Sequence, residues 1–296
     1  MELASGVTII VGPTGVGKTA FAHAKAQAYG APILSADSRQ IYRHMSIGTA
    51  APSLRLRREV DYYFVQTLSP DAAYSAYDFA EDALQLTSQL LSEGHERVLI
   101  VGGSMLYIQA LLFRMDPIPS VPAAVRTEVW ELFQEKGLAP IREELRQVDP
   151  LYLDRVDPNN HRRLIRALEV YRSTGRAFSS FHTGCLRDLP FPVQVMALER
   201  EREVLYDRIN RRVEEMLAEG LVAEAQALLP YRDRNALRTI GYKECFAYLD
   251  GKITLEECKR LIQKNTRVFA RQQLRFFQKL PGVQVIRLDK VHAFEV

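Results

Sequence analysis

The chain has 296 residues, of which 47% are hydrophobic and 25% charged, and its formal net charge is +3. This is the composition of a globular protein with one large domain or one domain plus an insert. No apolar run approaches the roughly 20 residues of a membrane span and no signal peptide is evident, so we expect a cytoplasmic protein without membrane contact. The separated cysteines Cys185, Cys245 and Cys258 form no C-x-x-C, which argues against a zinc site or a disulfide framework.

A glycine-rich loop lies near the N-terminus. It follows the β-branched run 7–11, which we expect to be a buried strand, and precedes the alanine-rich stretch 20–26, which we expect to be a helix. In this context the pattern G-x-x-x-x-G-K-[ST] binds phosphate: loop N–H groups converge on phosphate oxygens, Lys18 adds charge, and the Thr19 hydroxyl can ligate Mg²⁺. The sequence therefore predicts a site for a di- or triphosphate, the ligand class that includes ATP. The alternative is an ordinary glycine-rich turn. The loop consists of Gly12, Pro13, Thr14, Gly15, Val16, Gly17, Lys18 and Thr19.

A second strand, expected at 32–36, ends at Asp37. Ligands of open α/β sheets sit beyond the carboxyl ends of the strands, so we expect Asp37 to face the phosphates held by Lys18. There a carboxylate can bind metal through water or accept a proton from a nucleophile. The alternative is an aspartate that caps the next helix.

A helix expected at 74–91 leads to a third buried strand at 98–101, which runs into Gly102, Gly103 and Ser104. Motor NTPases and switch GTPases carry a Mg²⁺-holding aspartate in the corresponding part of the site. No aspartate ends this strand, which argues against both classes. The tight loop instead offers backbone N–H groups and one hydroxyl to a ligand, and a helix is expected from 105 to 113.

The proline-rich segment 116–122 marks a boundary, and residues 126–190 are expected to be all helical. Arginines crowd one end of a helix whose body spans 161–171. They are Arg162, Arg163 and Arg166. A helical insert with a basic edge suits a backbone-phosphate partner, and the alternative is a solvated charged face.

Strand character returns at 193–198, and a helix is expected at 202–220. Arg208 and Arg212 lie one turn apart on that helix, where two arginines can clamp a pyrophosphate or act as a lid. The alternative is pairing with nearby acids such as Glu215.

A long helix is expected at 254–280, followed by an edge strand at 283–288. Cations recur every three or four residues along this helix and form one basic face, the footprint expected for a nucleic-acid backbone, with a solvated surface as the alternative. This basic face consists of Arg260, Lys264, Arg267, Arg271 and Arg275. The apolar residues that recur every seven positions, and that we expect in the core, are Ile262, Phe269 and Phe276.

In their order and combination, these motifs resemble the tRNA dimethylallyltransferases, also called tRNA isopentenyltransferases, along nearly the whole chain. The similarity covers the phosphate loop and the segments 37–42, 47–50, 101–107, 166–171, 174–175 and 240–244, and Arg271-Gln272 stands where the family has its own Arg-Gln. It implies an α/β fold with a P-loop NTPase-like parallel sheet flanked by helices at 1–115 and 191–296. The all-helical insert at 116–190 would grip the anticodon arm.

The resemblance also implies a reaction, in which a dimethylallyl group moves from its diphosphate to N6 of the adenosine 3′ of the tRNA anticodon. Asp37, Lys18, Thr19 and Ser104 would be catalytic, Mg²⁺ would be held at Thr19, and Arg208 and Arg212 would join the loop in binding diphosphate. The residues expected to contact tRNA are Asp37, Ser38, Arg39, Gln40, Ser104, Arg126, Arg162, Arg163, Leu164, Ile165, Arg166, Arg238, Thr239, Ile240, Gly241, Tyr242, Lys243, Arg267 and Arg271.

Some positions depart from the family pattern: Ser104 replaces a threonine, Ala51 replaces a common lysine, Arg58-Glu59-Val60 stands where many members carry a His-His pair, and 274–277 departs from Thr-Trp-Phe-Arg. Three alternatives stay open: a small-molecule or nucleotide kinase, a paralogue that prenylates free adenine nucleotides, and a non-catalytic RNA-binding module. The basic helix and the basic insert favour tRNA, because a small substrate needs neither. We expect the chain to act as a monomer.

Overall fold

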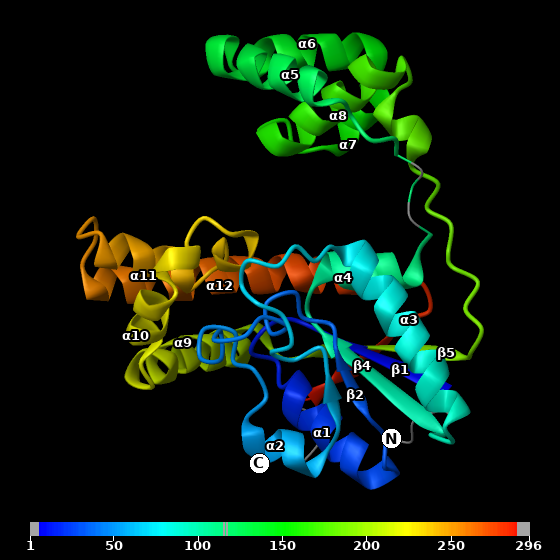
Figure 1. Cartoon of the computed structure of the whole chain (residues 1–296), viewed down its shortest axis with the longest axis vertical. Coiled ribbons are helices and arrows are strands. Elements are labelled where there is room, and N and C mark those ends of the chain that lie inside the picture. The colour runs from blue at the N-terminus through cyan, green and yellow to red at the C-terminus, as the bar shows by residue number, and fades with distance from the viewer. Residues whose placement is uncertain (1–5, 115, 117, 289–296) are drawn as a thin grey trace. The chain divides into compact units, whose positions relative to one another are not determined.

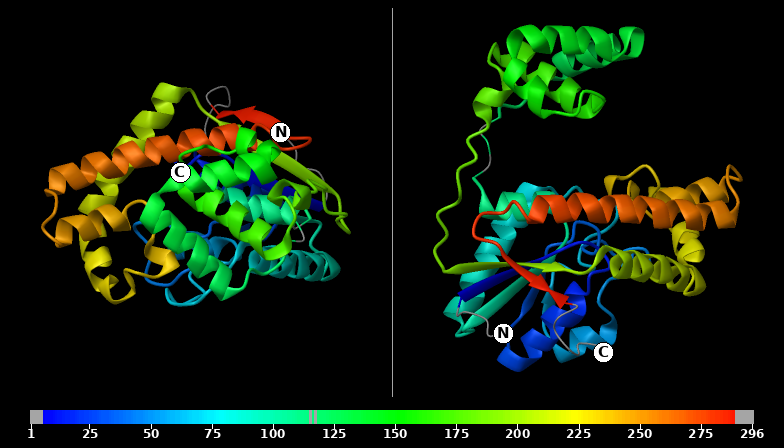
Figure 2. Two further views of the ribbon diagram at one scale, coloured as in Figure 1. Left: turned by 90° about the horizontal axis from the view of Figure 1, so that it is seen from above. Right: turned by 180° about the vertical axis from the view of Figure 1, so that it is seen from behind.

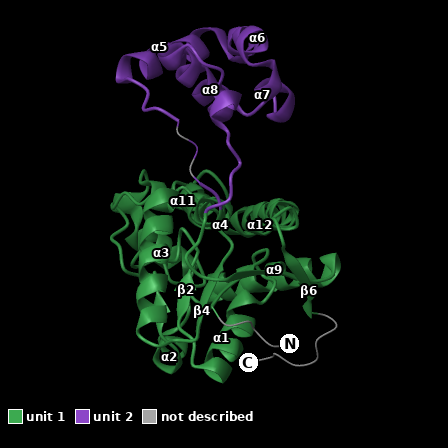
Figure 3. Ribbon diagram, turned by 90° about the vertical axis from the view of Figure 1, so that its right-hand side faces the viewer, with its two compact units in different colours: residues 1–112, 188–296 green, residues 113–187 purple. Residues whose placement is uncertain are grey.

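The computed structural model describes residues 6–114, 116 and 118–288. The chain divides into two compact units, shown in Figure 3: a core unit, residues 1–112 and 188–296, and a helical unit, residues 113–187. Each boundary falls three residues earlier than the sequence predicted. Pro117, part of the proline-rich boundary, lies outside the described residues.

The core unit contains one six-stranded sheet, and every pairing in it is parallel. In spatial order its strands are β3 (Tyr62–Tyr63), β2 (Ile33–Ser35), β4 (Arg97–Gly102), β1 (Gly6–Val11), β5 (Val193–Glu199) and β6 (Gln284–Arg287). The expected α/β fold with a parallel sheet is confirmed, as is the edge strand near the C-terminus. β1 lies between β4 and β5, so the loop that follows it opens at the carboxyl edge of the sheet centre.

Helices cover both faces of this sheet. α1 (Lys18–Tyr29) and α2 (Leu54–Glu59) lie on one side, and α4 (Met105–Leu112) and α12 (Leu255–Phe277) lie on the other (Figures 1 and 2). The remaining helices of this unit are α3 (Ala76–Ser92), α9 (Arg202–Ala218), α10 (Leu221–Ala227) and α11 (Tyr242–Leu249), with short 3₁₀ turns at Leu229–Tyr231 and Asn235–Leu237. Four short elements were not predicted from the sequence: the helices α2, α10 and α11 and the strand β3. Each has eight residues or fewer, too short for its periodicity to stand out.

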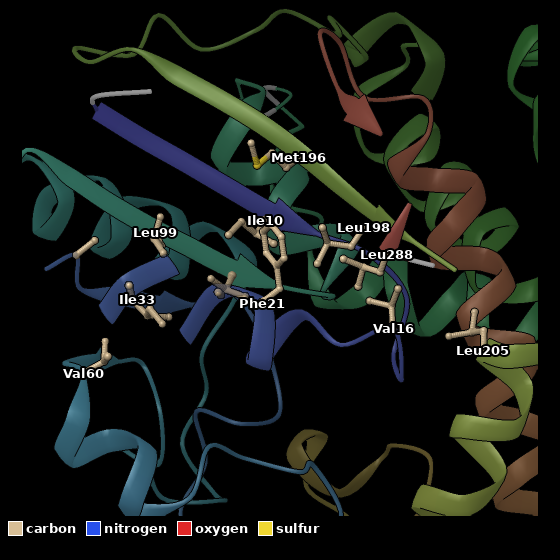
Figure 4. Packing of buried hydrophobic residues seen from close by; sticks show 14 of the residues in the cluster. Ile10, Val16, Phe21, Ile33, Val60, Leu99, Met196, Leu198, Leu205 and Leu288 are labelled. Carbon is tan, nitrogen blue, oxygen red and sulfur yellow. The ribbon is translucent and has the colours of Figure 1, made fainter. Parts of the chain in front are cut away.

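Burial on both faces explains why the central strands are continuous apolar runs. Ile10 of β1, Leu99 of β4 and Met196 of β5 are each 0% exposed (Figure 4). Val16 of the phosphate loop joins the same cluster and is also fully buried. Burying one such aliphatic side chain stabilises the fold by about 1.5–3 kcal/mol, so the loop is anchored to the core through Val16.

The buried stripe of α12 differs from the one expected. Ile262 is buried as predicted, but Phe269 and Phe276 are only half-buried, and Ala270, Gln273 and Phe277 lie in the core instead. A seven-residue spacing drifts about 20° per repeat around an α-helix, so the stripe that faces a straight sheet follows the 3.6-residue period. The prediction for Phe269 and Phe276 was therefore wrong.

The helical unit consists of α5 (Ala123–Lys136), α6 (Leu138–Val148), α7 (Pro150–Arg155), α8 (His161–Thr174) and a 3₁₀ turn at Phe178–Phe181. Asn160 caps the start of α8 with its side chain and Gly175 ends it in the left-handed region. Residues 182–190 are not helical, contrary to the all-helical prediction, and the bridge Phe113–Leu186 pairs part of this segment with the other connection. Within the described residues, no helix combines the length and apolar character that crossing a membrane requires.

Candidate active site

The glycine-rich loop joins β1 to α1, as predicted. Gly12, Gly15 and Gly17 have φ angles of 151°, 81° and 107°, which favour glycine. A Cβ at Gly12 would lie 2.7 Å from the Leu198 carbonyl oxygen, so only glycine fits there without a shift. Gly17 precedes α1 without a side-chain cap, which leaves N–H groups at the positive end of a 12-residue helix open to an anion.

Lys18 lies inside this loop. Its Nζ donates hydrogen bonds to the carbonyl oxygens of Gly12 and Pro13, both at 2.9 Å. Burial lowers the pKa of Lys18 to about 8, Asp37 opposes that shift, and Arg212 adds to it. Lys18, Asp37 and Arg212 therefore share one electrostatic site, although they come from three separate segments of the chain.

Asp37 sits where β2 ends and holds a turn rather than a helix. Its Oδ1 accepts hydrogen bonds from the backbone N–H groups of Arg39 at 2.9 Å and Gln40 at 3.3 Å. Asp37 therefore does not cap a helix, as the alternative had it, although Oδ1 stabilises this turn. Among the described residues Oδ2 has no hydrogen-bond partner, so that oxygen remains available to a ligand.

Ser104, at the end of β4, lies beside the Asp37 turn. Its Oγ accepts a hydrogen bond from the Ser38 N–H at 2.7 Å and donates one to the Ser38 hydroxyl at 3.1 Å. The β2 and β4 ends are also joined directly, because Ala36 N donates to Val101 O at 2.8 Å. Ser104 therefore fixes the loop that carries Asp37 at the carboxyl edge of the sheet.

Two arginines of α9 converge on the same loop. Arg208 Nε donates to the Gly15 carbonyl oxygen at 3.0 Å. Burial lowers the pKa of Arg212, and the charges of Asp37 and then Glu215 oppose that shift. Among the described residues Arg212 forms no ion pair or hydrogen bond, so Glu215 influences it only at longer range. The arrangement favours anion binding over the pairing alternative.

A cavity lies between the start of α1 and the ends of β2 and β4. Its polar lining includes Lys18, Thr19 and Asp37, together with Ser35, Gln40 and Gly102. The rest of the lining is mainly apolar and consists of Ala22, Ile33, Pro52, Tyr62 and Val101. Burial raises the pKa of Tyr62, so its hydroxyl stays neutral. A lining that combines phosphate-binding groups with apolar side chains suits a ligand with one charged and one hydrocarbon part.

The sequence reading missed two residues that hold the loop. Gln273 of α12 is buried: its Oε1 accepts from Thr14 N at 2.8 Å and its Nε2 donates to Gly103 O at 2.7 Å. The neighbouring Gln272 is exposed, so the glutamine that reaches the site is not the one in the expected Arg-Gln pair. Arg200 Nε donates to Val16 O at 2.9 Å. A signal for Gln273 existed, because it falls on the apolar stripe of its helix.

Several residues expected to contact tRNA are engaged within the protein. Arg39 donates to Asn235 O at 2.7 Å, and Gln40 Nε2 donates to Thr49 O and Ala50 O, both at 3.2 Å. These bonds tie the Asp37 turn to two neighbouring loops. The two side chains thus position the site, whatever they also contact.

The segment 238–243, all of which was expected to contact tRNA, is exposed only in part. Arg238 and Lys243 are exposed, Thr239 and Ile240 are half-buried, and Gly241 is buried. Tyr242 begins α11, is 0% exposed, and donates its hydroxyl hydrogen to Glu224 at 2.6 Å. Its ring cannot stack on a base in this conformation, so the expectation of a direct Tyr242–tRNA contact is corrected.

The residues of the helical unit that were expected to contact tRNA are also partly exposed and partly buried. Arg126, Arg162 and Arg163 are exposed, whereas Arg166 is half-buried and pairs with Glu169 at 3.5 Å. Leu164 and Ile165 point into the core of this unit and are 0% and 6% exposed. Their expected contact with tRNA is corrected, because a helix turns adjacent residues to different faces.

The basic face of α12 is partly covered by α9. Arg267 donates to the side chain of Asn210, and Arg271 donates to the Tyr206 hydroxyl at 3.1 Å. Arg260 pairs with Glu257 on its own helix at 2.6 Å. Lys264 and Arg275 are exposed.

Comparison with known proteins places these features in a family. The model of the IPP transferases matches residues 40–280. The chain is 42% identical to tRNA dimethylallyltransferase 2 of Parabacteroides distasonis over 287 residues, 97% of this chain and 96% of that protein. It is 45% identical to tRNA dimethylallyltransferase 1 of Porphyromonas gingivalis over 271 residues, 92% and 90% of the two chains. The crystal structure of the full-length tRNA isopentenylpyrophosphate transferase of Bacillus halodurans matches with a TM-score of 0.70 and 34% identity, covering 96% of this chain and 90% of that one.

Proposed function

Because the chain belongs to the IPP transferase family, we propose that it is a tRNA dimethylallyltransferase. It transfers the dimethylallyl group of dimethylallyl diphosphate to N6 of the adenosine 3′ of the anticodon. The observation that carries this proposal is the cavity lined both by Lys18, Thr19 and Asp37 and by the apolar side chains of Ala22, Ile33, Pro52 and Val101. The apolar part of this lining suits a short hydrocarbon chain, whereas the phosphoryl group moved by a kinase has no use for it.

The cations of the site suit the leaving diphosphate. As the bond between C1 of the dimethylallyl group and the diphosphate oxygen breaks, negative charge grows on that oxygen. Lys18, Arg208 and Arg212 converge on the loop where this charge develops. Donors held in advance at such a point lower the barrier without reorganising during the reaction.

The other reactant is the exocyclic amine of adenosine. A new bond forms between N6 and C1, and N6 must lose a proton. Asp37 suits this step, because its Oδ1 is fixed by the turn while Oδ2 has no partner among the described residues. Oδ2 would accept a hydrogen bond from the amine, orient it, and receive the proton.

The donor set also fits Mg²⁺. This ion prefers oxygen ligands and keeps several waters and substrate phosphates, so it needs few protein ligands. The Thr19 hydroxyl lies in the cavity lining next to Lys18 and Asp37, while the described residues contain no cluster of three or more His, Cys, Asp or Glu that would cage a metal. When bound at Thr19, Mg²⁺ would neutralise part of the diphosphate charge.

The RNA substrate requires a surface beyond this cavity. The candidates are the half-buried Ser38 beside the site and a set of exposed cations: Arg238 and Lys243, Lys264 and Arg275 on α12, and Arg126, Arg162 and Arg163 on the helical unit. Binding energy from these remote phosphate contacts would be used to extrude and align the adenosine. We propose that the chain acts as a monomer in the cytoplasm, where tRNA is found.

Acceptor choice tests the proposal. Labelled dimethylallyl diphosphate is incubated with an anticodon stem-loop, AMP, ADP or ATP at about 0.1 M salt, where surface charges are partly screened. We expect incorporation into the stem-loop and none into the free nucleotides. Prenylation of AMP or ATP without transfer to the stem-loop would instead identify a free-nucleotide enzyme. Phosphate transfer from ATP to a small acceptor, with no prenylation, would identify a kinase.

A further inference from the structure

An aromatic row on the helical unit has no part in the site described above. Trp130 and Phe133 lie on α5, and His161 is the first residue of α8. The ring centroids of Trp130 and Phe133 are 5.5 Å apart, and those of Phe133 and His161 are 5.4 Å apart with an interplanar angle of 6°. Three rings from two helices are therefore in series, with Trp130 at one end.

The central ring of the row packs against the core of the unit, whereas Trp130 at one end is open to solvent. Phe133 is half-buried against the core of the unit, and Val129, next to Trp130, is fully buried. Trp130 itself is 49% exposed, although a ring of this size buries well when a core offers it room. About half of the Trp130 surface is therefore open to a ligand, and an aromatic face can stack on a flat ring.

Exposed cations flank the row. One helical turn from Trp130 lie Arg126, Thr127, Phe133 and Gln134, none of which is acidic, whereas the acids of α5, Glu128, Glu131 and Glu135, lie at other positions around the helix. At the other end, Arg162 and Arg163 follow His161 directly and are exposed. Cations in the first turn of a helix oppose its dipole, so these two arginines do not serve the stability of α8.

The turn before α8 holds this arrangement in place. Arg142 of α6 donates from Nε to Pro158 O at 2.7 Å and from Nη2 to Asn159 Oδ1 at 3.0 Å. Asn159 N donates in turn to Asp157 Oδ1 at 2.9 Å. The start of α8, and with it the His161 ring, is thus tied to the rest of the helical unit.

We propose that Trp130, Phe133 and His161 form a stacking platform for an unpaired base of an RNA single strand, with Arg126, Arg162 and Arg163 binding the adjacent phosphates. Exposed aromatic rings flanked by cations are the combination that binds single-stranded nucleic acid, because every base has a flat face and every link a negative charge. A paired duplex cannot offer a free base face to Trp130. The proposal rests on the proposed function in taking the RNA to be the substrate stem-loop.

Trp130 is the only tryptophan of the chain, so its fluorescence reports on the platform alone. The full-length protein is titrated with the anticodon stem-loop and, separately, with an RNA duplex carrying the same number of phosphates. We expect the stem-loop to quench the emission and the duplex to leave it unchanged at equal occupancy. Equal quenching by both RNAs, or stem-loop binding without quenching, would overturn the platform.

Substitutions give a second, independent readout. Trp130→Ala should raise the KM for the stem-loop about 10- to 100-fold, the effect of losing one base–aromatic stack. Trp130→Phe should recover most of that loss, and the KM for dimethylallyl diphosphate should not change. The matched control is Leu151→Ala, which truncates another apolar residue of the same unit that is 51% exposed. Equal KM values for Trp130→Ala and Leu151→Ala would contradict the proposal.

The two readouts separate this inference from the proposed function. Quenching by the stem-loop without any prenyl transfer would leave the platform standing and refute the reaction. Prenyl transfer to the stem-loop with neither quenching nor a KM effect would do the reverse.

Discussion

Replacing Gln273 with leucine should loosen the phosphate loop from the opposite side of the sheet. The leucine keeps the approximate size of the side chain but removes both hydrogen bonds, to Thr14 N and Gly103 O. The Gly103 bond is buried, and leaving a buried polar group unsatisfied costs about 1–3 kcal/mol. The Thr14 N–H is only partly buried, so water can replace part of its lost bond. Together these terms give a loss of about 2–4 kcal/mol in the free energy of unfolding of the core unit.

Gln272→Leu is the matched control, because it makes the same chemical change one residue away at an exposed position. Its effect on stability should stay within about 0.5 kcal/mol. Urea unfolding followed by far-ultraviolet circular dichroism measures both variants. It avoids tryptophan fluorescence, which would report only on the helical unit.

The same pair of variants tests the link to the site. Thr14 belongs to the loop and Gly103 adjoins Ser104, so Gln273→Leu should also raise the KM for dimethylallyl diphosphate, by about tenfold for each 1.4 kcal/mol of lost binding energy. Gln272→Leu should leave that KM unchanged. If the two variants unfolded at the same urea concentration and bound the substrate equally well, Gln273 would not hold the loop and the reasoning would be refuted.

Lys18→Ala should reduce prenyl transfer about 10²–10³-fold and leave tRNA binding intact, as rates and gel-shift affinities would show; normal turnover would put the diphosphate elsewhere. Since the Lys18 pKa is about 8, its charge is present below pH 8, and the KM for dimethylallyl diphosphate should rise about tenfold per pH unit above that value. Asp37→Asn keeps an oxygen for the turn but removes the charge, so it should lower kcat about 10²–10⁴-fold without a change in diphosphate affinity; a near-normal kcat would reduce Asp37 to its turn. The double variant Lys264→Glu, Arg275→Glu should weaken tRNA binding. The slope of log K against log[salt] should become less steep by roughly 1.5–2, because fewer counterions are released on binding when two phosphate contacts are lost. An unchanged salt slope would remove α12 from the RNA surface. Lys264 and Arg275 are chosen for this test rather than Arg267 and Arg271, because reversing the charge of the latter two would also break their contacts with α9.

Much of the site was predictable because it depends on patterns local in sequence. The phosphate loop is one continuous segment between a strand and a helix, and both its backbone conformation and its chemistry follow from glycine, lysine and threonine at fixed spacing. Asp37 and Ser104 were found by a general rule, since both follow buried strands and the carboxyl ends of parallel strands share one edge. The family resemblance then supplied the reaction.

What the sequence could not determine were the pairings between distant segments. It showed that Arg267, Arg271 and Tyr242 are polar or aromatic, but not that α9 covers the first two and Glu224 holds the third. Burial is a property of the neighbours that a residue meets, and those neighbours lie tens to hundreds of positions away.

Gln273 shows the same division within one residue. The sequence alone shows that Gln273 falls on the apolar stripe of α12, where the helix faces the core. Which groups it serves depends on the packing of α12 against the loop and the β4 end, 259 and 170 residues earlier in the chain. The local chemistry of the loop was thus determined by the sequence alone, whereas the tertiary structure decided what holds that loop in place, because a buried amide is stable only where packing brings it a donor and an acceptor.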